Sequence, residues 1–245
     1  MLVFVLIFAI IIFIYVHLLF HWKVSNEIDI PHVVKPTKDN LEIIADMRQP
    51  FIFENPINTP FHLEGSELLV NIKKMNEKAI RVSHKSMLSA IKKDGYLSEG
   101  NGLFLKKTDW NQELLDLNAY FTPPMNLWNY YDILYGNKSV HTDIKQSIYY
   151  RNYIVVLDGN IEIKLTPPET EVKGDENVWE GGEEGVNTIT TILIPLKRGS
   201  VLHIPAYWWW SIKMPEFSSV MLLSYSTYMN TLALLPEKVN GYLKG

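Results

Sequence analysis

Residues 198–212 read RGSVLHIPAYWWWSI and are the most informative part of the chain. The segment opens with a turn at 197–199, continues as the apolar run 200–205 and ends in four adjacent rings, from Tyr207 to Trp210. On an antiparallel strand successive side chains alternate between faces, so this run would present two rings to each face. Large rings in such a position normally pack in a core or against a sheet. The segment therefore predicts a strand enclosed within a β-rich domain.

Short β-rich runs separated by turns extend over the whole C-terminal half. Two of them, 148–157 and 160–165, flank the dipeptide Asp158-Gly159, and the second run alternates between apolar and polar residues. An Asp-Gly dipeptide between two such runs favours a β-hairpin. Further runs of this kind are 188–196, 200–205 and 218–229. The C-terminal half is therefore predicted to be a meander of antiparallel strands.

The preceding part of the chain mixes helices with short strands. Apolar residues recur with helical spacing in 39–47, 83–93 and 111–121. Asp39 or Thr37 could cap the first of these helices. Residues 50–53 and 68–72 read as short strands. Helices followed by a meander of strands predict an α+β chain, mainly β, built on a β-barrel or sandwich.

The composition agrees with one folded domain and limits its chemistry. The chain has 245 residues, of which 47% are hydrophobic and 12% aromatic, enough for a sizeable core. Its formal net charge of -4 argues against a general nucleic-acid binder, so no nucleic-acid partner is expected. The absence of cysteine excludes disulfides, thiolate zinc sites, iron–sulfur clusters and a cysteine nucleophile. The acidic segment 169–185 is interpreted as a solvated excursion, because it lacks the ligand spacing of a calcium loop.

The N-terminus is interpreted as a membrane anchor. Residues 2–20 form an uncharged apolar run that would span roughly 28 Å as a helix, close to the hydrocarbon thickness of a bilayer. Trp22 and Lys23 follow, where an interface is expected. A cleaved signal peptide is the rival interpretation, but no basic region precedes the run and no small-residue cleavage site follows it. We expect a single-span anchor at 1–22 that contacts the lipid bilayer through 2–20, and a juxtamembrane linker at 23–40. The side of the membrane stays open.

Three segments follow a recognisable common pattern. They are the opening 30–53, the strand–glycine–strand–Pro-Pro unit at 155–168, and 198–212 with its Pro205 and its Trp208-Trp209 pair. Together they resemble the Jumonji-C/cupin-like family, the group of iron(II)- and 2-oxoglutarate-dependent oxygenases with a double-stranded β-helix.

The resemblance implies a jelly-roll (double-stranded β-helix, cupin-like) domain at 41–245 with N-terminal helices, preceded by one transmembrane helix. A jelly-roll encloses space between two sheets, so its inward side chains are large and apolar. The strings YYRNY and IPAYWWWSI also resemble uncharacterised Jumonji-like proteins encoded by large DNA viruses of eukaryotes.

The family holds its iron with two histidines and one carboxylate, and this chain departs from that pattern. Its His-x-Asp triplet is His141-Thr142-Asp143. In the family the histidine lies nearer to the following turn glycine than His141 lies to Gly159, whereas Lys145 has the matching spacing. In that register Lys145 and Ser147 replace the histidine and the carboxylate. A lysine ammonium has no lone pair to donate and would repel iron(II).

The remaining positions depart from the pattern too. Trp210 stands where the distal histidine is expected, and an indole offers no lone pair to a metal. Ile161 stands where some members carry a lysine that binds the 2-oxoglutarate carboxylate. His203 would complete two histidines and a carboxylate with His141 and Asp143. It lies near the far end of the strand from Trp210, so this rescue is disfavoured.

The sequence therefore predicts a membrane-anchored Jumonji/cupin-like domain without catalytic or metal-binding residues, acting as a binding or structural module. No cofactor is expected, whereas a protein partner is. The side chains predicted to line its pocket or interface are Lys145, Tyr149, Tyr153, His203, Tyr207, Trp208, Trp209 and Trp210. The alternative is an oxygenase that uses iron(II) and 2-oxoglutarate on a protein side chain, with His141 and Asp143 as ligands. A sugar or small-ligand binder that uses the tryptophan faces is a third interpretation.

Overall fold

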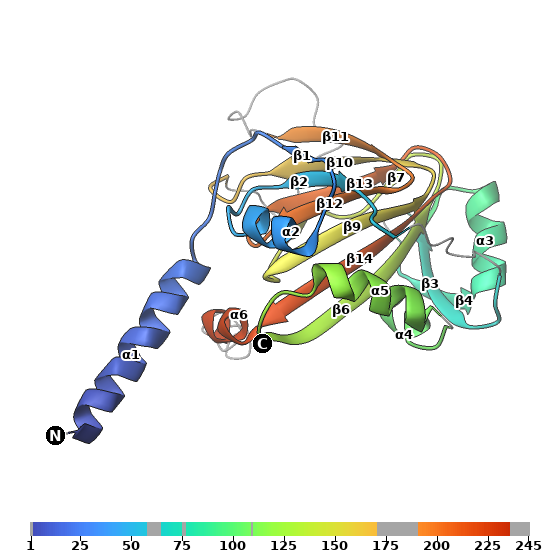
Figure 1. The fold of residues 1–245 in the computed structure, drawn as a ribbon. Helices are drawn as coiled ribbons and strands as arrows, with labels where there is room; N and C mark the ends of the chain where they lie inside the picture. Colours follow the sequence, from blue (N-terminus) through green and yellow to red (C-terminus); the bar gives the residue numbers. More distant parts are fainter. Residues whose placement is uncertain (1, 58–64, 75–76, 109, 171–190, 236–245) are drawn as a thin grey trace.

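The structure is a computed structural model that describes residues 2–57, 65–74, 77–108, 110–170 and 191–235. Two β-sheets form the body of the domain, helices cover part of the larger sheet, and a long N-terminal helix projects from one end (Figure 1). This arrangement confirms the predicted class, mainly β with helices, and its two open sheets are those of a jelly-roll.

The larger sheet contains nine strands among the described residues, in the order β1-β2-β12-β9-β14-β6-β5-β3-β4. They are β1 (His32–Val33), β2 (Phe51–Glu54), β3 (Leu69–Lys74), β4 (Ile80–Ser83), β5 (Tyr96–Ser98), β6 (Asn126–Gly136), β9 (Arg151–Asp158), β12 (Ser200–Pro205) and β14 (Ser218–Thr227). Its long central pair, β14 and β6, is antiparallel and runs from Ser218 opposite Gly136 to Thr227 opposite Asn126. The sheet therefore joins the N-terminal strands to the C-terminal ones.

The smaller sheet has the order β11-β10-β13-β7, and β8 also pairs with β13. Its strands are β7 (Val140–His141), β8 (Lys145–Gln146), β10 (Asn160–Thr166), β11 (Ile192–Lys197) and β13 (Trp209–Met214). The Asp158-Gly159 turn exists, and Gly159 has φ +74. The predicted hairpin is wrong, however, because β9 pairs with β12 and β14 while β10 pairs with β11 and β13. The turn therefore passes the chain from one sheet to the other.

The space between the two sheets is filled by apolar side chains that follow the period of two. On β10, Ile161, Ile163 and Leu165 are buried, whereas the intervening Glu162 and Lys164 are only half-buried. Leu165 lies opposite Trp210 on the neighbouring strand. The other buried members of this core include Leu134, Ile154, Val156, Leu202, Ile204, Trp208, Ile212, Met214, Val220 and Leu222. The interior of the jelly-roll is therefore a packed core along most of its length.

A second core lies between the larger sheet and its helices. The helices are α2 (Lys38–Ala45), α3 (His84–Lys93), α4 (Gly102–Leu105) and α5 (Asn111–Phe121). Of the two predicted caps, Thr37 is the one that caps α2, by accepting a hydrogen bond from the Asn40 backbone N–H, and Asp39 lies within the helix. Leu41, Met87 and Phe121 from the helices are fully buried in one cluster with residues of β2, β9 and β14. This layer fixes the outer face of the larger sheet.

The N-terminal helix α1 (Leu2–His21) stands apart from the sheets (Figure 1). Residues Leu2–Leu19 are long and apolar enough to cross a membrane, and none of that segment is buried. By length and composition α1 is therefore a candidate membrane span. A signal sequence near the N-terminus would meet the same criterion. The end of α1 packs beside the short helix α6 (Tyr228–Ala233).

Three local features differ from the sequence interpretation. β6 was not predicted, because NLWNYYDILYG shows no clean alternation. The run of four rings does not lie on one strand, because Tyr207 has φ +72 in a turn and β13 begins at Trp209. The segment 23–40, expected to be a linker, contains β1, which pairs in parallel with β2.

Most of the acidic segment 169–185 lies outside the described residues.

Candidate functional site

The structure brings Lys145 and Trp210 together at one end of the jelly-roll. β8 pairs with β13 so that Lys145 lies directly opposite Trp210. The Lys145 ammonium lies 5.8 Å from the centroid of the Trp210 ring, within the range of a cation–π contact. These are the two positions at which the family resemblance expects metal-binding histidines. A cation and an indole therefore face one another there.

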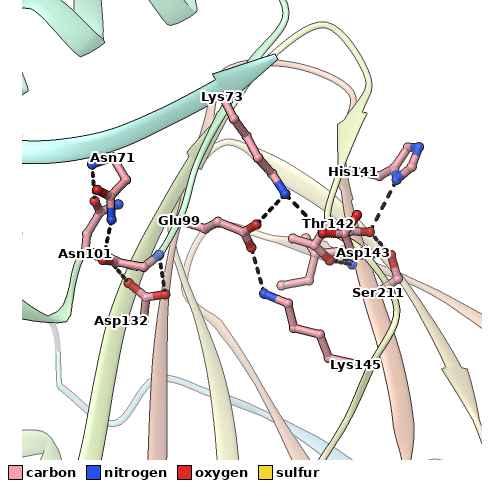
Figure 2. A network of polar contacts seen from close by, with 12 residues as sticks. Asn71, Lys73, Glu99, Asn101, Asp132, His141, Thr142, Asp143, Lys145 and Ser211 are labelled. Atoms are coloured by element: carbon pink, nitrogen blue, oxygen red, sulfur yellow. Dashed lines mark hydrogen bonds and ion pairs between the residues drawn. The ribbon is translucent and has the colours of Figure 1, made fainter. Parts of the chain in front are cut away.

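An ion-pair chain extends from Lys145 across the end of the barrel. Glu99, which follows β5, accepts from the Lys145 ammonium at 2.7 Å and from the Lys73 ammonium at 2.8 Å. Lys73 also pairs with Asp143 at 3.0 Å, so four charged side chains from β3, β8 and two loops meet here (Figure 2). The side chain of Glu99 is 17% exposed. The ion-pair chain therefore lies at the boundary between the core and solvent.

The charged side chains of this ion-pair chain stabilise one another. Burial on its own would raise the pKa of Glu99, but the ammonium groups of Lys145 and Lys73 lower it below its ordinary value. Burial would lower the pKa of Lys73, whereas Glu99 and Asp143 raise it. Glu99 and Lys73 are therefore both held in their charged forms.

A buried carboxylate holds the loop that carries Glu99. Asp132 on β6 accepts hydrogen bonds from the backbone N–H groups of Gly100 at 2.8 Å and Asn101 at 2.5 Å (Figure 2). The Asn101 side chain donates to the Ile133 carbonyl and accepts from the Asn71 backbone N–H, both at 2.8 Å. Burial raises the pKa of Asp132, and the backbone N–H groups of Gly100, Asn101 and Ile133, which all donate to its carboxylate, act against that rise. This cluster positions Glu99 over the end of the barrel.

The predicted alternative ligands do not converge on a site in the barrel. Thr142 is the buried member of the triplet; its hydroxyl accepts from the Ile212 backbone N–H at 3.0 Å. The Asp143 side chain is 68% exposed and pairs with Lys73. The His141 ring contacts the Thr142 carbonyl at 3.3 Å (Figure 2). Throughout the described part of the chain, no group of three His, Cys, Asp or Glu side chains could hold a metal.

The other positions expected from the family carry structural roles. Ser147 is buried and its hydroxyl accepts a hydrogen bond from the Asn152 amide. Asn152 in turn accepts from the Ser224 hydroxyl at 2.9 Å. Ile161 is 1% exposed, in the core between the sheets. The donor set at these positions, an ammonium, a hydroxyl, an indole and an alkyl group, does not fit iron(II) or 2-oxoglutarate.

His203 and Tyr153 lie on the opposite face of the larger sheet from this site. The His203 ring stacks on Phe51 at 4.5 Å between centroids and lies 5.1 Å from the Tyr153 ring. Burial, with a smaller effect of Arg151, holds the pKa of His203 well below its usual range. Burial raises the pKa of Tyr153 to about 12. Both side chains belong to the helix-covered core, so the structure does not bring them together with Lys145.

The remaining predicted aromatic residues divide between the core, the site and α1. Trp208 is fully buried between the sheets, and Trp209 is half-buried at the start of β13. The Tyr207 ring contacts His21 at the end of α1, 6.5 Å between centroids. Tyr149 stacks on Tyr130 of β6 at 6.0 Å.

Sequence reasoning missed several residues of this site. Tyr130 on β6 belongs to the site and is 42% exposed, and Trp128, two residues before it on the same strand, lies outside the site and is 47% exposed. Burial and the nearby Asp132 raise the pKa of Tyr130 to about 12. Glu99 and Lys73 were also missed, because isolated charges at the ends of short strands carry no motif. We call Lys73, Glu99, Lys145, Tyr130, Tyr149 and Trp210 the barrel-mouth site.

Comparison with known proteins supports the fold alone. No protein-family model and no curated protein matches the chain. The X-ray structure of E. coli ycfD matches 80% of this chain at 13% identity with a TM-score of 0.51. The match covers 54% of ycfD, so the chain spans about half of the length of that protein. The crystal structure of a cupin superfamily protein from Desulfitobacterium hafniense DCB-2 matches with 10% identity and a TM-score of 0.29. That match covers 40% of this chain and 67% of the other. The likeness to ycfD agrees with the jelly-roll arrangement of the two sheets.

Proposed function

We propose that the chain is a membrane-anchored cupin-like domain of the Jumonji type that acts as a binding module without oxygenase chemistry. The observation that carries the proposal is the ion-pair chain of Lys145, Glu99 and Lys73. Its member Lys145 stands where the family resemblance expects one metal-binding histidine, and Lys145 lies beside Trp210, which stands where the other is expected. A site already filled by its own paired charges has no open coordination position to offer.

The exposed aromatic side chains beside the ion-pair chain support a binding role. Trp128 and Tyr130 each expose close to half of their surface, and Tyr149 stacks on Tyr130. Tyrosine and tryptophan supply large contact areas with few rotatable bonds, which makes them frequent anchors of protein interfaces. We therefore propose a protein segment as the ligand of the barrel-mouth site. The anchor is supplied by α1, whose apolar side chains are exposed to the surroundings.

Metal binding by the full-length chain in detergent tests the proposal. The protein is loaded anaerobically with iron(II), with and without 2-oxoglutarate, and bound iron is measured after gel filtration. We expect no stoichiometric iron in either condition. His141→Ala is measured beside His32→Ala, an exposed histidine on β1. One iron per chain that is lost in His141→Ala but retained in His32→Ala would refute the proposal and make the chain a candidate oxygenase.

A further inference from the structure

The end of α1 is built into the domain and not attached through a flexible joint. His21, the last residue of α1, is 2% exposed. Its Nε2 atom lies 3.0 Å from the Asn230 side-chain nitrogen on α6, and its ring stacks on Tyr150 at 5.6 Å. The direction of α1 is therefore fixed relative to the sheets and to α6.

Backbone strain gathers around this junction. Arg48, Met125 and Tyr207 have φ values of +62, +55 and +72. Residues with side chains adopt this region at a cost of roughly 1 kcal/mol each, so their surroundings must hold them there. Arg48 is buried and its guanidinium lies 4.4 Å from the centroid of the Tyr150 ring. The junction is a defined part of the fold.

The short helix α6 has one buried and one exposed side. Asn230, Ala233 and Leu234 are at most 5% exposed. On the outer side, Tyr228 is 52% exposed and Leu232 is 41% exposed. The exposed side of a surface helix is normally polar, whereas this one presents a ring and an aliphatic side chain.

This apolar surface continues from α6 to its neighbours. Leu235, two residues past the end of α6, is 45% exposed, and Met125 is 67% exposed. The Tyr228 backbone N–H donates to the Met125 carbonyl at 3.4 Å, which places Met125 at the start of α6. We call Met125, Tyr228, Leu232 and Leu235 the α6 face.

The α6 face is continuous with the candidate membrane span. α6 packs against α1 near its C-terminal end (Figure 1). A cavity of about 410 Å³ lies between them and is lined by Val16 and His17 of α1 together with Met125 and Met229. The last turns of α1 and the α6 face therefore lie at the same level of the molecule. Trp22, just past α1, is 47% exposed there and is a residue type typical of the membrane interface.

We infer that the α6 face lies on the surface of the lipid bilayer that α1 crosses, with α6 as an interfacial helix. The inference rests on the proposed anchor, because α1 determines where the bilayer lies. A bilayer that surrounds the apolar length of α1 reaches the level of α6, and there the four apolar side chains leave water for the headgroup region. Tyrosine, with an apolar ring and a polar tip, suits that depth.

The absence of cysteine makes the inference directly testable, because a single introduced cysteine carries the only label. Leu232→Cys and Met125→Cys report on the α6 face. Ile80→Cys on β4, where Ile80 is 60% exposed, is the matched control on the domain. Ile11→Cys, within α1, reports on the anchor itself. Each full-length variant is labelled with an environment-sensitive fluorophore, reconstituted into phosphatidylcholine vesicles, and quenched with doxyl-labelled lipid.

We expect labels at 232 and 125 to emit at shorter wavelength than the label at 80 and to be quenched several-fold more by doxyl lipid. Strong quenching at 11 combined with water-like behaviour at 232, 125 and 80 would overturn the inference and leave the anchor intact. Absence of quenching at 11 as well would overturn both the anchor and the inference. The three patterns are distinct, so the two conclusions fail separately.

Discussion

Replacing Glu99 by glutamine tests whether the ion-pair chain of the barrel-mouth site stabilises the fold. The amide would keep one acceptor oxygen, but its nitrogen would face an ammonium group of Lys73 or Lys145. A hydrogen bond to a charged group contributes about 1.5–3 kcal/mol when buried. The Lys145 side chain is 39% exposed and that of Lys73 19%, so solvent screening reduces each contact. We expect a loss of about 2 kcal/mol for the pair.

Thermal unfolding of the full-length chain in detergent, followed by tryptophan emission, measures this loss. For a chain of this size about 2 kcal/mol corresponds to a midpoint lower by roughly 4–8 °C. Glu54→Gln, an exposed carboxylate on β2, is the control and should leave the midpoint unchanged. Because the folded pKa of Glu99 lies below its ordinary value of 4.5, its contribution is present above that pH and disappears as the pH falls through the folded pKa. An equal loss in both variants, or a loss that persists in acid, would refute the ion-pair explanation.

Three further substitutions test the core and two turns that connect the sheets. His203→Phe should raise the melting midpoint, since the buried ring stacks on Phe51 and its nitrogens make no hydrogen bond of normal geometry to described residues. The gain should grow between pH 7 and pH 5, because the lowered pKa of His203 makes its protonation favour unfolding; a gain independent of pH would contradict this. Gly159→Ala should cost about 2–3 kcal/mol in chemical denaturation, because its Cβ would collide with the Phe217 carbonyl as well as adopting φ +74. Gly199→Ala, with φ +84 and open space around the Cβ position, should cost only about 1 kcal/mol, and equal losses would remove steric collision as the cause.

The C-terminal strands were predictable because their burial follows the chain's own alternation. β10 buries Ile161, Ile163 and Leu165 as its sequence pattern requires. α5 was also predicted correctly at 111–121, because its apolar residues recur with helical spacing. The pairing across the Asp158-Gly159 turn was wrong for a physical reason. A turn dipeptide determines the local backbone, whereas the partners of the two strands depend on which sheet each one joins.

The barrel-mouth site was only half predictable. Lys145 and Trp210 were identified through their positions in a family pattern, and the structure pairs the two strands at these residues. Glu99 and Lys73 were not, because an ion pair between residues far apart in the chain has no local pattern. β6 was missed because its first half lies exposed at the open end of the barrel, which removes the alternation that burial on one face produces.

The burial of His21 limits how the domain can encounter a partner. A domain on a long flexible tether samples a wide volume and all orientations. Here α1 ends inside the domain, at Asn230 and Tyr150, so every tilt or rotation of the helix turns the sheets by the same amount. When α1 spans a bilayer, the domain moves as a rigid body in two dimensions with the barrel mouth at a constant height. Partners held in the same membrane then meet it at high effective concentration and in a restricted set of orientations, while dissolved partners must approach from one side.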